Sequence, residues 1–305
     1  MALTINTNLS SIVAQQNLQK ATGSLNQAIE RMTTGYRINH AGDNAAGYSI
    51  ARNWETQLGS LDVAADNAAT GADMMSTLED HYSLISSHLQ RVRDLTEQAA
   101  NGTYGSASLA AIKSEITARL EEVDRISKNC EFNGLHLMNG SMSAINIQVG
   151  LYSSTDSQIE LSADLFKKGD VGTLFKTYSK GDNGVTVDGN LDTIAKVAVA
   201  CTSIKADGTI DEDVKPSDML SKIDNVIKEI SNRTTTLGAA QNRIDSAIES
   251  ISVQSENITS SLSTLRDADV AKESSNFIQA QILQQAAATL LSTANQTPSI
   301  ALNLL

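Results

Sequence analysis

The chain has 305 residues, a net charge of −12, an aromatic content of 4% and only two prolines. A chain that is short of aromatic volume and rich in Ala, Leu and Ile favours long helices packed side by side over a compact globule. Its 23 Lys and Arg residues are dispersed. We therefore expect no nucleic-acid partner, because such binders neutralise phosphates with clustered basic residues.

The start of the chain lacks the basic and apolar regions of a secretory signal peptide. No apolar run is long enough to cross a bilayer, so we expect no membrane span. These features predict a chain that either stays in the cytoplasm or leaves it by a route that does not read a cleaved signal peptide.

The first predicted helix carries a narrow apolar seam with alternating spacings of three and four residues. Its members are Leu18, Ala21, Leu25, Ala28 and Met32. This spacing is typical of coiled-coil helices, which cannot bury their seam alone. Gly35 and the polar residues 39–44 then predict a break.

Two further predicted helices, over residues 75–99 and 109–130, repeat this spacing, the second with Arg119 as its one polar position. The centre of the chain differs, because residues 145–149 and 159–161 alternate as half-buried strands do. Residues 171–216 are rich in Gly and Asp, and we predict turns there with short strands or a small helix.

The longest seam runs over residues 220–265, which as one helix would extend about 70 Å. Residues 266–269 interrupt it, and a last apolar run follows. That run comprises Phe277, Ala280, Leu283, Ala287, Leu290 and Ala294. Because the breaks lie at similar distances from the two chain ends, we expect the end segments to pair. The predicted fold is mainly α, an elongated hairpin-like rod of long coiled-coil-type helices with a small β-containing central part.

Several ordered motifs resemble those of bacterial flagellins. Met32-Thr33-Thr34-Gly35-Tyr36-Arg37-Ile38-Asn39 resembles the flagellin pattern of a helix end followed by Ser/Thr-Gly-x-Arg-Ile-Asn, with Tyr36 where Leu is common. Similar matches follow at residues 43–51, 89–95, 114–117, 132–134, 237–244, 281–286 and 294–296. The resemblance covers roughly residues 1–165 and 217–305, and leaves about 171–216 unmatched.

The resemblance implies a subunit that polymerises into the flagellar filament for motility. Residues 1–43 plus 265–305 would form a terminal coiled-coil domain lining the filament core, and residues 44–170 plus 217–264 a helical rod domain with a β-hairpin region near 131–165. Residues 171–216 would be a short variable surface-exposed insert. The subunit would be secreted through flagellar type III export and reside in the extracellular filament.

The implied partners are further copies of the chain, an export chaperone, and the hook-junction and cap proteins. On the terminal helices we predict a polymerisation seam of Leu18, Leu25, Met32, Phe277, Leu283, Ala287 and Leu290. Small seam residues let helices approach closely but bury little area, so we expect the ends to be disordered in the free subunit and to fold on assembly.

The resemblance also implies recognition of the monomer by a host flagellin-sensing Toll-like receptor. The predicted receptor-contact and assembly face comprises Gln90, Arg91, Leu95, Gln98, Ile112 and Glu115. Leu95 falls beside the apolar seam, which predicts exposed apolar surface next to Arg91. The alternative is that Arg91 and Glu115 form lateral filament contacts or an intramolecular ion pair.

Other residue groups favour plain structural interpretations. The histidines His40, His81, His88 and His136 lack zinc-site spacing, and Asp211-Glu212-Asp213 lacks the glycine and terminal glutamate of a calcium loop. Cys130 and Cys201 do not form a disulfide framework. Exposed hydroxyls such as Ser153, Ser154, Thr155 and Ser179 could equally carry O-linked glycans or be unmodified.

Three rival functions remain for the sequence. They are a hook-junction protein with similar terminal helices, a soluble coiled-coil binding protein, and an enzyme hidden in the middle segment. A catalytic domain has little room in about 45 residues, so we predict no enzyme and no cofactor.

Overall fold

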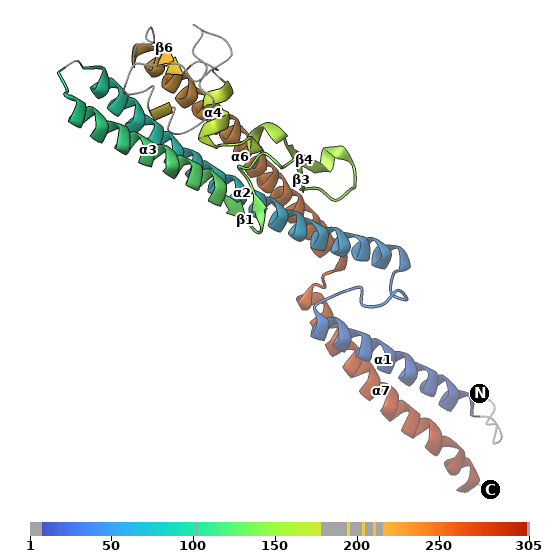
Figure 1. Cartoon of the computed structure of the whole chain (residues 1–305). Coiled ribbons are helices and arrows are strands. Elements are labelled where there is room, and N and C mark those ends of the chain that lie inside the picture. The colour runs from blue at the N-terminus through green and yellow to red at the C-terminus, as the bar shows by residue number, and fades with distance from the viewer. Residues whose placement is uncertain are drawn as a thin grey trace. The chain divides into compact units, whose positions relative to one another are not determined.

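The computed structural model describes residues 8–101, 103–177, 194–195, 203–204, 210–211 and 216–303 (Figure 1). The chain divides into two compact units, Met1–Gly59 with Gln254–Leu305, and Ser60–Val253. We call the first the terminal unit and the second the central unit. The element order confirms a mainly helical fold, with long helices from both chain ends and a small β-containing centre.

The terminal unit is built on two helices from opposite ends of the chain, α1 (Leu9–Thr34) and α7 (Val270–Asn303). They lie side by side and antiparallel, as Figure 1 shows. The Asn8 side chain caps α1 by accepting a hydrogen bond from the Ser11 amide at 3.1 Å. The Asp269 side chain accepts hydrogen bonds from the first amides of α7. Both helices therefore start at residues that satisfy their free amide groups.

Gly35 ends α1 in a left-handed conformation with φ of 74°, which a side chain would strain. The following residues pair with the chain leading into α7. Tyr36 and Asp267 form an antiparallel bridge, the Arg37 amide donates to the Arg266 carbonyl at 2.6 Å, and the Ala268 amide donates to the Gly35 carbonyl at 2.8 Å. The predicted breaks in both legs are thus joined by backbone hydrogen bonds.

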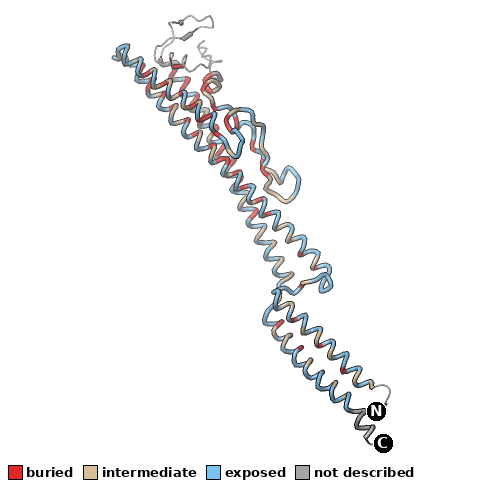
Figure 2. The backbone as a smooth tube through the Cα atoms, turned by 60° about the horizontal axis from the view of Figure 1, so that its bottom comes forward, coloured by how far each residue is buried: buried red, intermediate tan, exposed pale blue. Residues whose placement is uncertain are grey.

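The central unit contains most of α2 (Ala45–Ala100), all of α3 (Ser106–Asn129) and most of α6 (Pro216–Arg266). The buried positions on α2 follow the predicted seam, with Met75, Leu78, Tyr82, Ile85, Leu89 and Val92 all inaccessible to solvent. They form one core with buried residues of α3 and α6. Figure 2 shows this buried stripe along the three helices.

The α3 seam differs from the prediction in one place. Leu120 is fully buried in the core, whereas Arg119 is only half-buried and its guanidinium approaches the Glu115 carboxylate. The helix turns its apolar stripe by one residue here because Leu120 gains more from burial than a guanidinium, whose charge needs water or a partner.

Short β elements follow α3. Strands β1 (Glu131–Phe132) and β2 (Leu135–His136) form a hairpin, whose turn residues Asn133 and Gly134 both have positive φ, as the favoured tight hairpin turn requires. Strands β3 (Ile145–Gln148) and β4 (Gln158–Leu161) pair antiparallel. The strands predicted from alternation are confirmed.

The remaining elements are small. Two 3-10 turns, η1 (Thr155–Ser157) and η2 (Ala163–Phe166), flank β4, and α4 (Val171–Thr177) follows. The two-residue strands β5 (Ser203–Ile204) and β6 (Ile210–Asp211) pair antiparallel.

Most of the predicted insert at 171–216, including Cys201, Ser179, Glu212 and Asp213, lies outside the described residues. Its first residues are not surface-exposed as predicted. Val171, Leu174 and Phe175 are buried in the core of the central unit, because α4 places apolar side chains three and four residues apart on one face.

Candidate assembly interface

Small residues form the contact between α1 and α7. Ala14, Ala21 and Ala28 are the buried residues of α1, and Ala280 and Ala287 are buried on α7. Alanine allows two helices to approach closely but buries little apolar area, so this contact contributes modestly to stability.

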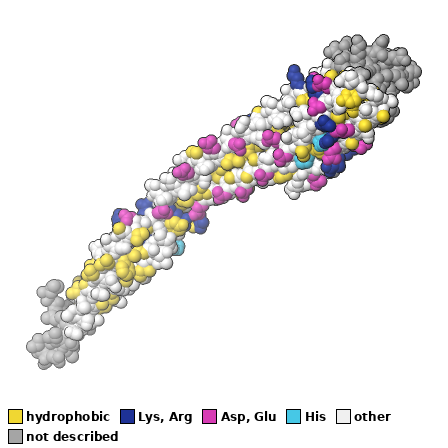
Figure 3. Space-filling model, turned by 90° about the vertical axis from the view of Figure 1, so that its left-hand side faces the viewer, with side chains coloured by type: hydrophobic (Ala, Val, Ile, Leu, Met, Phe, Trp, Pro, Cys, Tyr) yellow, Lys and Arg dark blue, Asp and Glu magenta, His cyan; other side chains and the backbone are white. Residues whose placement is uncertain are grey.

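Many large apolar side chains of the same two helices lie outside this contact. We call them the outer apolar residues: Leu9, Ile12, Val13, Ile29, Met32, Val270, Ile278, Ile282, Leu283 and Leu290. Leu290 is 64% exposed and Ile282 60% exposed, and the space-filling view shows hydrophobic side chains gathered on the pair (Figure 3). Apolar surface of this extent marks a protein contact site.

Grooves on the pair provide shape for such a contact. One, of about 620 Å³, is lined by Leu9, Val13 and Ala14 of α1 and by Leu290 and Ala294 of α7, among others. A second, of about 590 Å³, is more polar and includes Lys20 and Arg31. Both lie within the terminal unit and combine residues of the two helices, so each exists only when α1 and α7 are paired.

The predicted seam residues divide between these two environments. Ala287 is buried, and Leu18, Leu25 and Phe277 are half-buried between the helices. Met32, Leu283 and Leu290 are exposed. The seam on α7 continues instead through Gln284 and Leu291, which are half-buried. The contact between the two helices therefore uses Gln284 and Leu291 in place of Leu283 and Leu290, because these positions continue the 3–4 spacing from Ala280. That Leu283 and Leu290 serve polymerisation stays a prediction.

Polar contacts join the pair along its length. The Ser11 hydroxyl donates to the Asn295 side chain at 2.7 Å, and the Gln284 amide donates to the Thr22 hydroxyl at 3.1 Å. The Asn8 side chain donates to the Ala294 carbonyl at 2.6 Å. These bonds lie between residues 262 or more apart in the chain and confirm that the two ends pair.

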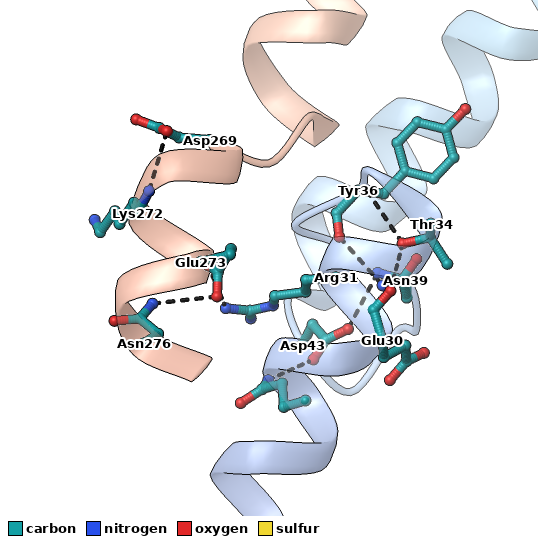
Figure 4. Close-up of polar contacts among 11 residues, drawn as sticks. Glu30, Arg31, Thr34, Tyr36, Asn39, Asp43, Asp269, Lys272, Glu273 and Asn276 are labelled. Carbon is teal, nitrogen blue, oxygen red and sulfur yellow. Dashed lines mark hydrogen bonds and ion pairs between the residues drawn. The ribbon is translucent and has the colours of Figure 1, made fainter. Parts of the chain in front are cut away.

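An ion pair joins α1 and α7 near the Tyr36–Asp267 bridge. Arg31 Nη1 lies 3.4 Å from Glu273 Oε1, and Asn276 donates to the other carboxylate oxygen at 3.1 Å. Figure 4 shows Arg31 and Asn276 approaching Glu273 from either side. The Glu273 residue is only 6% exposed, so this carboxylate depends on these partners for stability.

A second cluster surrounds the bridge itself. The Arg266 guanidinium lies 4.0 Å from the centre of the Tyr36 ring and forms an ion pair with Glu55. The Arg37 guanidinium donates to the Leu265 carbonyl at 2.6 Å. These contacts hold the end of α6, the linker after α1 and the start of α2 together within the terminal unit.

The predicted receptor-contact face has a polar part that is accessible. Arg91 and Glu115 form an ion pair of 3.0 Å between α2 and α3, and both side chains are more than a third exposed. Gln90 is exposed, and the exposed Gln98 donates to the Tyr104 hydroxyl at 2.9 Å. The intramolecular ion pair considered from the sequence is thus present.

The apolar part of that predicted face is not accessible. Leu95 is 2% exposed and Ile112 is 7% exposed, and both belong to the core of the central unit. The expectation that Leu95 offers exposed apolar surface is wrong. The prediction assumed that α2 buries only the narrow apolar stripe of a two-helix contact. In the structure α2 shares a core with α3 and α6 and therefore buries a wider stripe, which includes Leu95.

The histidines considered from the sequence contact residues of the chain itself. His40 and His136 lie near Glu30 and Glu131, and His81 contacts the Thr77 carbonyl. Across the part of the chain that the structure describes, no three His, Cys, Asp or Glu side chains come together as a metal site would require. None of the helices described there is long and apolar enough to cross a membrane.

Cys130 lies at zero exposure beyond the end of α3. Burial raises the pKa of its thiol to about 12, which keeps it protonated and unreactive at neutral pH. Cys130 therefore packs as a small apolar residue of the core.

Sequence reasoning missed most of the outer apolar residues. Ile12, Val13, Ile29, Ile278 and Ile282 fall off the predicted seams, and a search for one seam per helix passes over them. The available signal was that both terminal helices carry apolar residues beyond the seam. A pair of helices with alanines between them and large apolar residues exposed on the outside offers a surface for protein contacts, as the subunit of an assembly does.

Comparison with known proteins identifies the family of the chain. The family model for the bacterial flagellin N-terminal helical region matches residues 5–143, and that for the C-terminal helical region matches residues 220–305. The chain is 36% identical over 319 residues to a flagellin from Xenorhabdus nematophila and 30% identical over 376 residues to polar flagellin F from Vibrio parahaemolyticus, with full coverage of both chains in each case.

A solved structure of a putative flagellar hook-associated protein from Vibrio parahaemolyticus has a TM-score of 0.57 at 13% identity, covering 74% of this chain and 100% of that chain. This likeness shows the fold alone. The sequence matches show that the chain belongs to the bacterial flagellin family. It is a structural subunit that polymerises with itself into the extracellular flagellar filament for motility, and not an enzyme.

Proposed function

We propose that the outer apolar residues of the α1–α7 pair are the surface through which subunits polymerise. The observation that carries this proposal is the reversed distribution of size on the two helices, with Ala287 buried between them and Leu290 exposed. Residues 1–43 with 265–305 then line the filament core, and residues 44–170 with 217–264 form the surrounding rod.

The free subunit is exported unfolded at its ends, which fold when other copies cover them. An isolated helix pair joined mainly by alanine is marginal in water, which supports folding coupled to assembly. The accessory partners in this scheme are the export chaperone and the hook-junction and cap proteins, as the family resemblance implies.

The test changes outer apolar residues and leaves the buried residues between α1 and α7 unchanged. In Ile282→Gln/Leu290→Gln, salt-induced assembly should fall at least tenfold, as measured by sedimentation and negative-stain microscopy. The matched control Ile282→Val/Leu290→Met keeps the surface apolar and should assemble as the parent chain does. Normal filaments from the Gln variant would show that these side chains face water in the polymer.

The same microscopy separates the rival functions. Long filaments support a filament subunit, short capped stubs would support a hook-junction role, and single particles of uniform size would support a soluble binding protein.

We propose further that the host flagellin-sensing Toll-like receptor recognises the monomer through the polar face formed by Gln90, Arg91, Gln98 and Glu115. The exposed ion pair between Arg91 and Glu115 supports this, because Arg is a favoured interface anchor. Leu95 and Ile112 act only by holding α2 and α3 in place. Arg91→Ala should reduce potency on receptor-bearing cells roughly thirtyfold, the effect of a typical hot spot.

The control for the receptor assay is Arg125→Ala. Like Arg91 on α2, Arg125 on α3 is an exposed arginine paired with a glutamate, in this case Glu122, so the loss of an exposed ion pair is matched. Circular dichroism must show that both variants are folded. Unchanged potency for folded Arg91→Ala would leave this face with an assembly role only.

A further inference from the structure

The apolar seam between α1 and α7 does not by itself determine how far the helices are shifted along each other. Buried alanines repeat every seven residues on α1, at Ala14, Ala21 and Ala28. On α7, Ala280 and Ala287 repeat at the same interval. Sliding one helix by seven residues brings each seam position against a position of the same repeat, so seam packing in the shifted register is nearly as favourable as in the observed one.

Glu273 breaks this equivalence. It lies seven residues before Ala280, in line with the buried alanines, and is itself buried. A shift of seven residues would move it about 10 Å from Arg31 and place it level with Ser24. The other cation on α1, Lys20, is 11 residues from Arg31 and lies four residues beyond Ser24, about 6 Å along the helix axis. A shifted Glu273 would therefore lose its ion pair with Arg31 and lie one helical turn from the nearest cation of α1, which is unfavourable for a buried carboxylate.

The backbone bridge between Tyr36 and Asp267 cannot make this choice alone. Its hydrogen bonds use amide and carbonyl groups, which neighbouring residues also possess. The side-chain contacts of Arg266 and Arg37 at the bridge join α2, α6 and the linker after α1 and do not involve α7. It holds the register that side chains select. We infer that Arg31 and Glu273 are positioning residues for filament assembly, because their ion pair sets the register in which the two terminal helices pair.

Register matters for the surface proposed above, and this inference rests on that proposal. The groove that brings Leu9 and Val13 next to Leu290 is made from both helices. A shift of about 10 Å would separate these residues, and the pair would present a different surface to the next subunit.

Two cysteine pairs report the register. Ser11→Cys/Asn295→Cys joins positions whose side chains are 2.7 Å apart, and Ser11→Cys/Ala288→Cys joins positions that meet only after a shift of seven residues. Both are made in a Cys201→Ser chain, and the buried Cys130 does not interfere. Intramolecular disulfides are measured by gel mobility after oxidation, in soluble and in sedimented protein.

The decisive variant is Arg31→Met/Glu273→Met, which keeps the volume and removes the preference for one register. We expect the ratio of shifted to native disulfide to rise at least fivefold over the parent chain. Glu273→Arg alone should reduce the native disulfide and filament yield at least fivefold, and Arg31→Glu/Glu273→Arg should restore both to at least half.

The inference would be overturned if Arg31→Met/Glu273→Met gave the same ratio of shifted to native disulfide as the parent chain. It would also be overturned if Arg31→Glu/Glu273→Arg failed to restore the native disulfide and the filament yield. This outcome is distinct from failure of the assembly proposal. If Ile282→Gln/Leu290→Gln formed normal filaments, the outer apolar surface would be refuted, while the disulfide ratios would still report whether Arg31 and Glu273 set the register.

Discussion

Truncation of Leu95 tests whether the apolar half of the predicted receptor face is core. Leu95 is 2% exposed, and Leu84 on the same helix is 50% exposed, so Leu84→Ala is a matched control for the same chemical change. Removing a buried leucine side chain costs about 2–5 kcal/mol, because apolar contacts are lost and a cavity remains. An exposed leucine loses little, about 0.5 kcal/mol.

The assay is urea unfolding of the monomer followed by far-UV circular dichroism. With a denaturant slope of about 2 kcal/mol per molar, Leu95→Ala should lower the midpoint of the main transition by about 1 M or more, and Leu84→Ala by less than about 0.3 M. Arg91→Ala removes an exposed ion pair and should cost less than about 1 kcal/mol. Equal effects of Leu95→Ala and Leu84→Ala would refute the core position and restore Leu95 as a surface anchor.

Three further changes have defined outcomes. Ala287→Asp places a charge in the α1–α7 contact and should abolish polymerisation, whereas Ala287→Ser should retain it, as sedimentation would show. Gly71→Val should expose the segment containing Ile147 to proteases, because an added Cβ would collide with the Ile147 side chain; an unchanged digestion pattern would contradict this packing. In a Cys201→Ser chain, Cys130 should react with thiol reagents at pH 8 only after unfolding, because burial raises its thiol pKa to about 12. The folded pKa lies above the ordinary 9.0, so this group stabilises the fold below pH 9 and that contribution is lost as pH rises toward 12.

The helices could be predicted from the sequence because their signal is local. Met75, Leu78 and Tyr82 follow a spacing that places them on one helix face, and all three are buried. Strands β3 and β4 could also be predicted from the sequence. Alternating apolar residues in two short runs with a turn between them indicate a pair of half-buried strands. In each case neighbours in sequence determine the element.

Burial across three helices was not readable in the same way. A two-helix seam assigns Leu95 to the surface, whereas a core shared by α2, α3 and α6 covers it. A third helix covers the residues on one side of a two-helix contact. The side that it covers depends on contacts between residues far apart in the sequence, such as the ion pair of 2.6 Å between Arg93 and Asp224. The choice of Leu120 over Arg119 on α3 depends on the same three-helix arrangement.

On the terminal helices alanines are buried while many larger apolar residues are exposed, and in the proposed assembly this lets one sequence serve both a free subunit and a polymer. If the leucines and isoleucines faced inward, the pair would be stable alone and its outside would be polar, with little left to bind another copy. With alanines inward, the intramolecular contact is weak and the larger apolar area, as at Leu290 and Ile282, is left for other subunits to cover. Weak inner packing also leaves the register undetermined, so a polar pair such as Arg31 and Glu273 is required where a seam of interlocking large side chains would have sufficed.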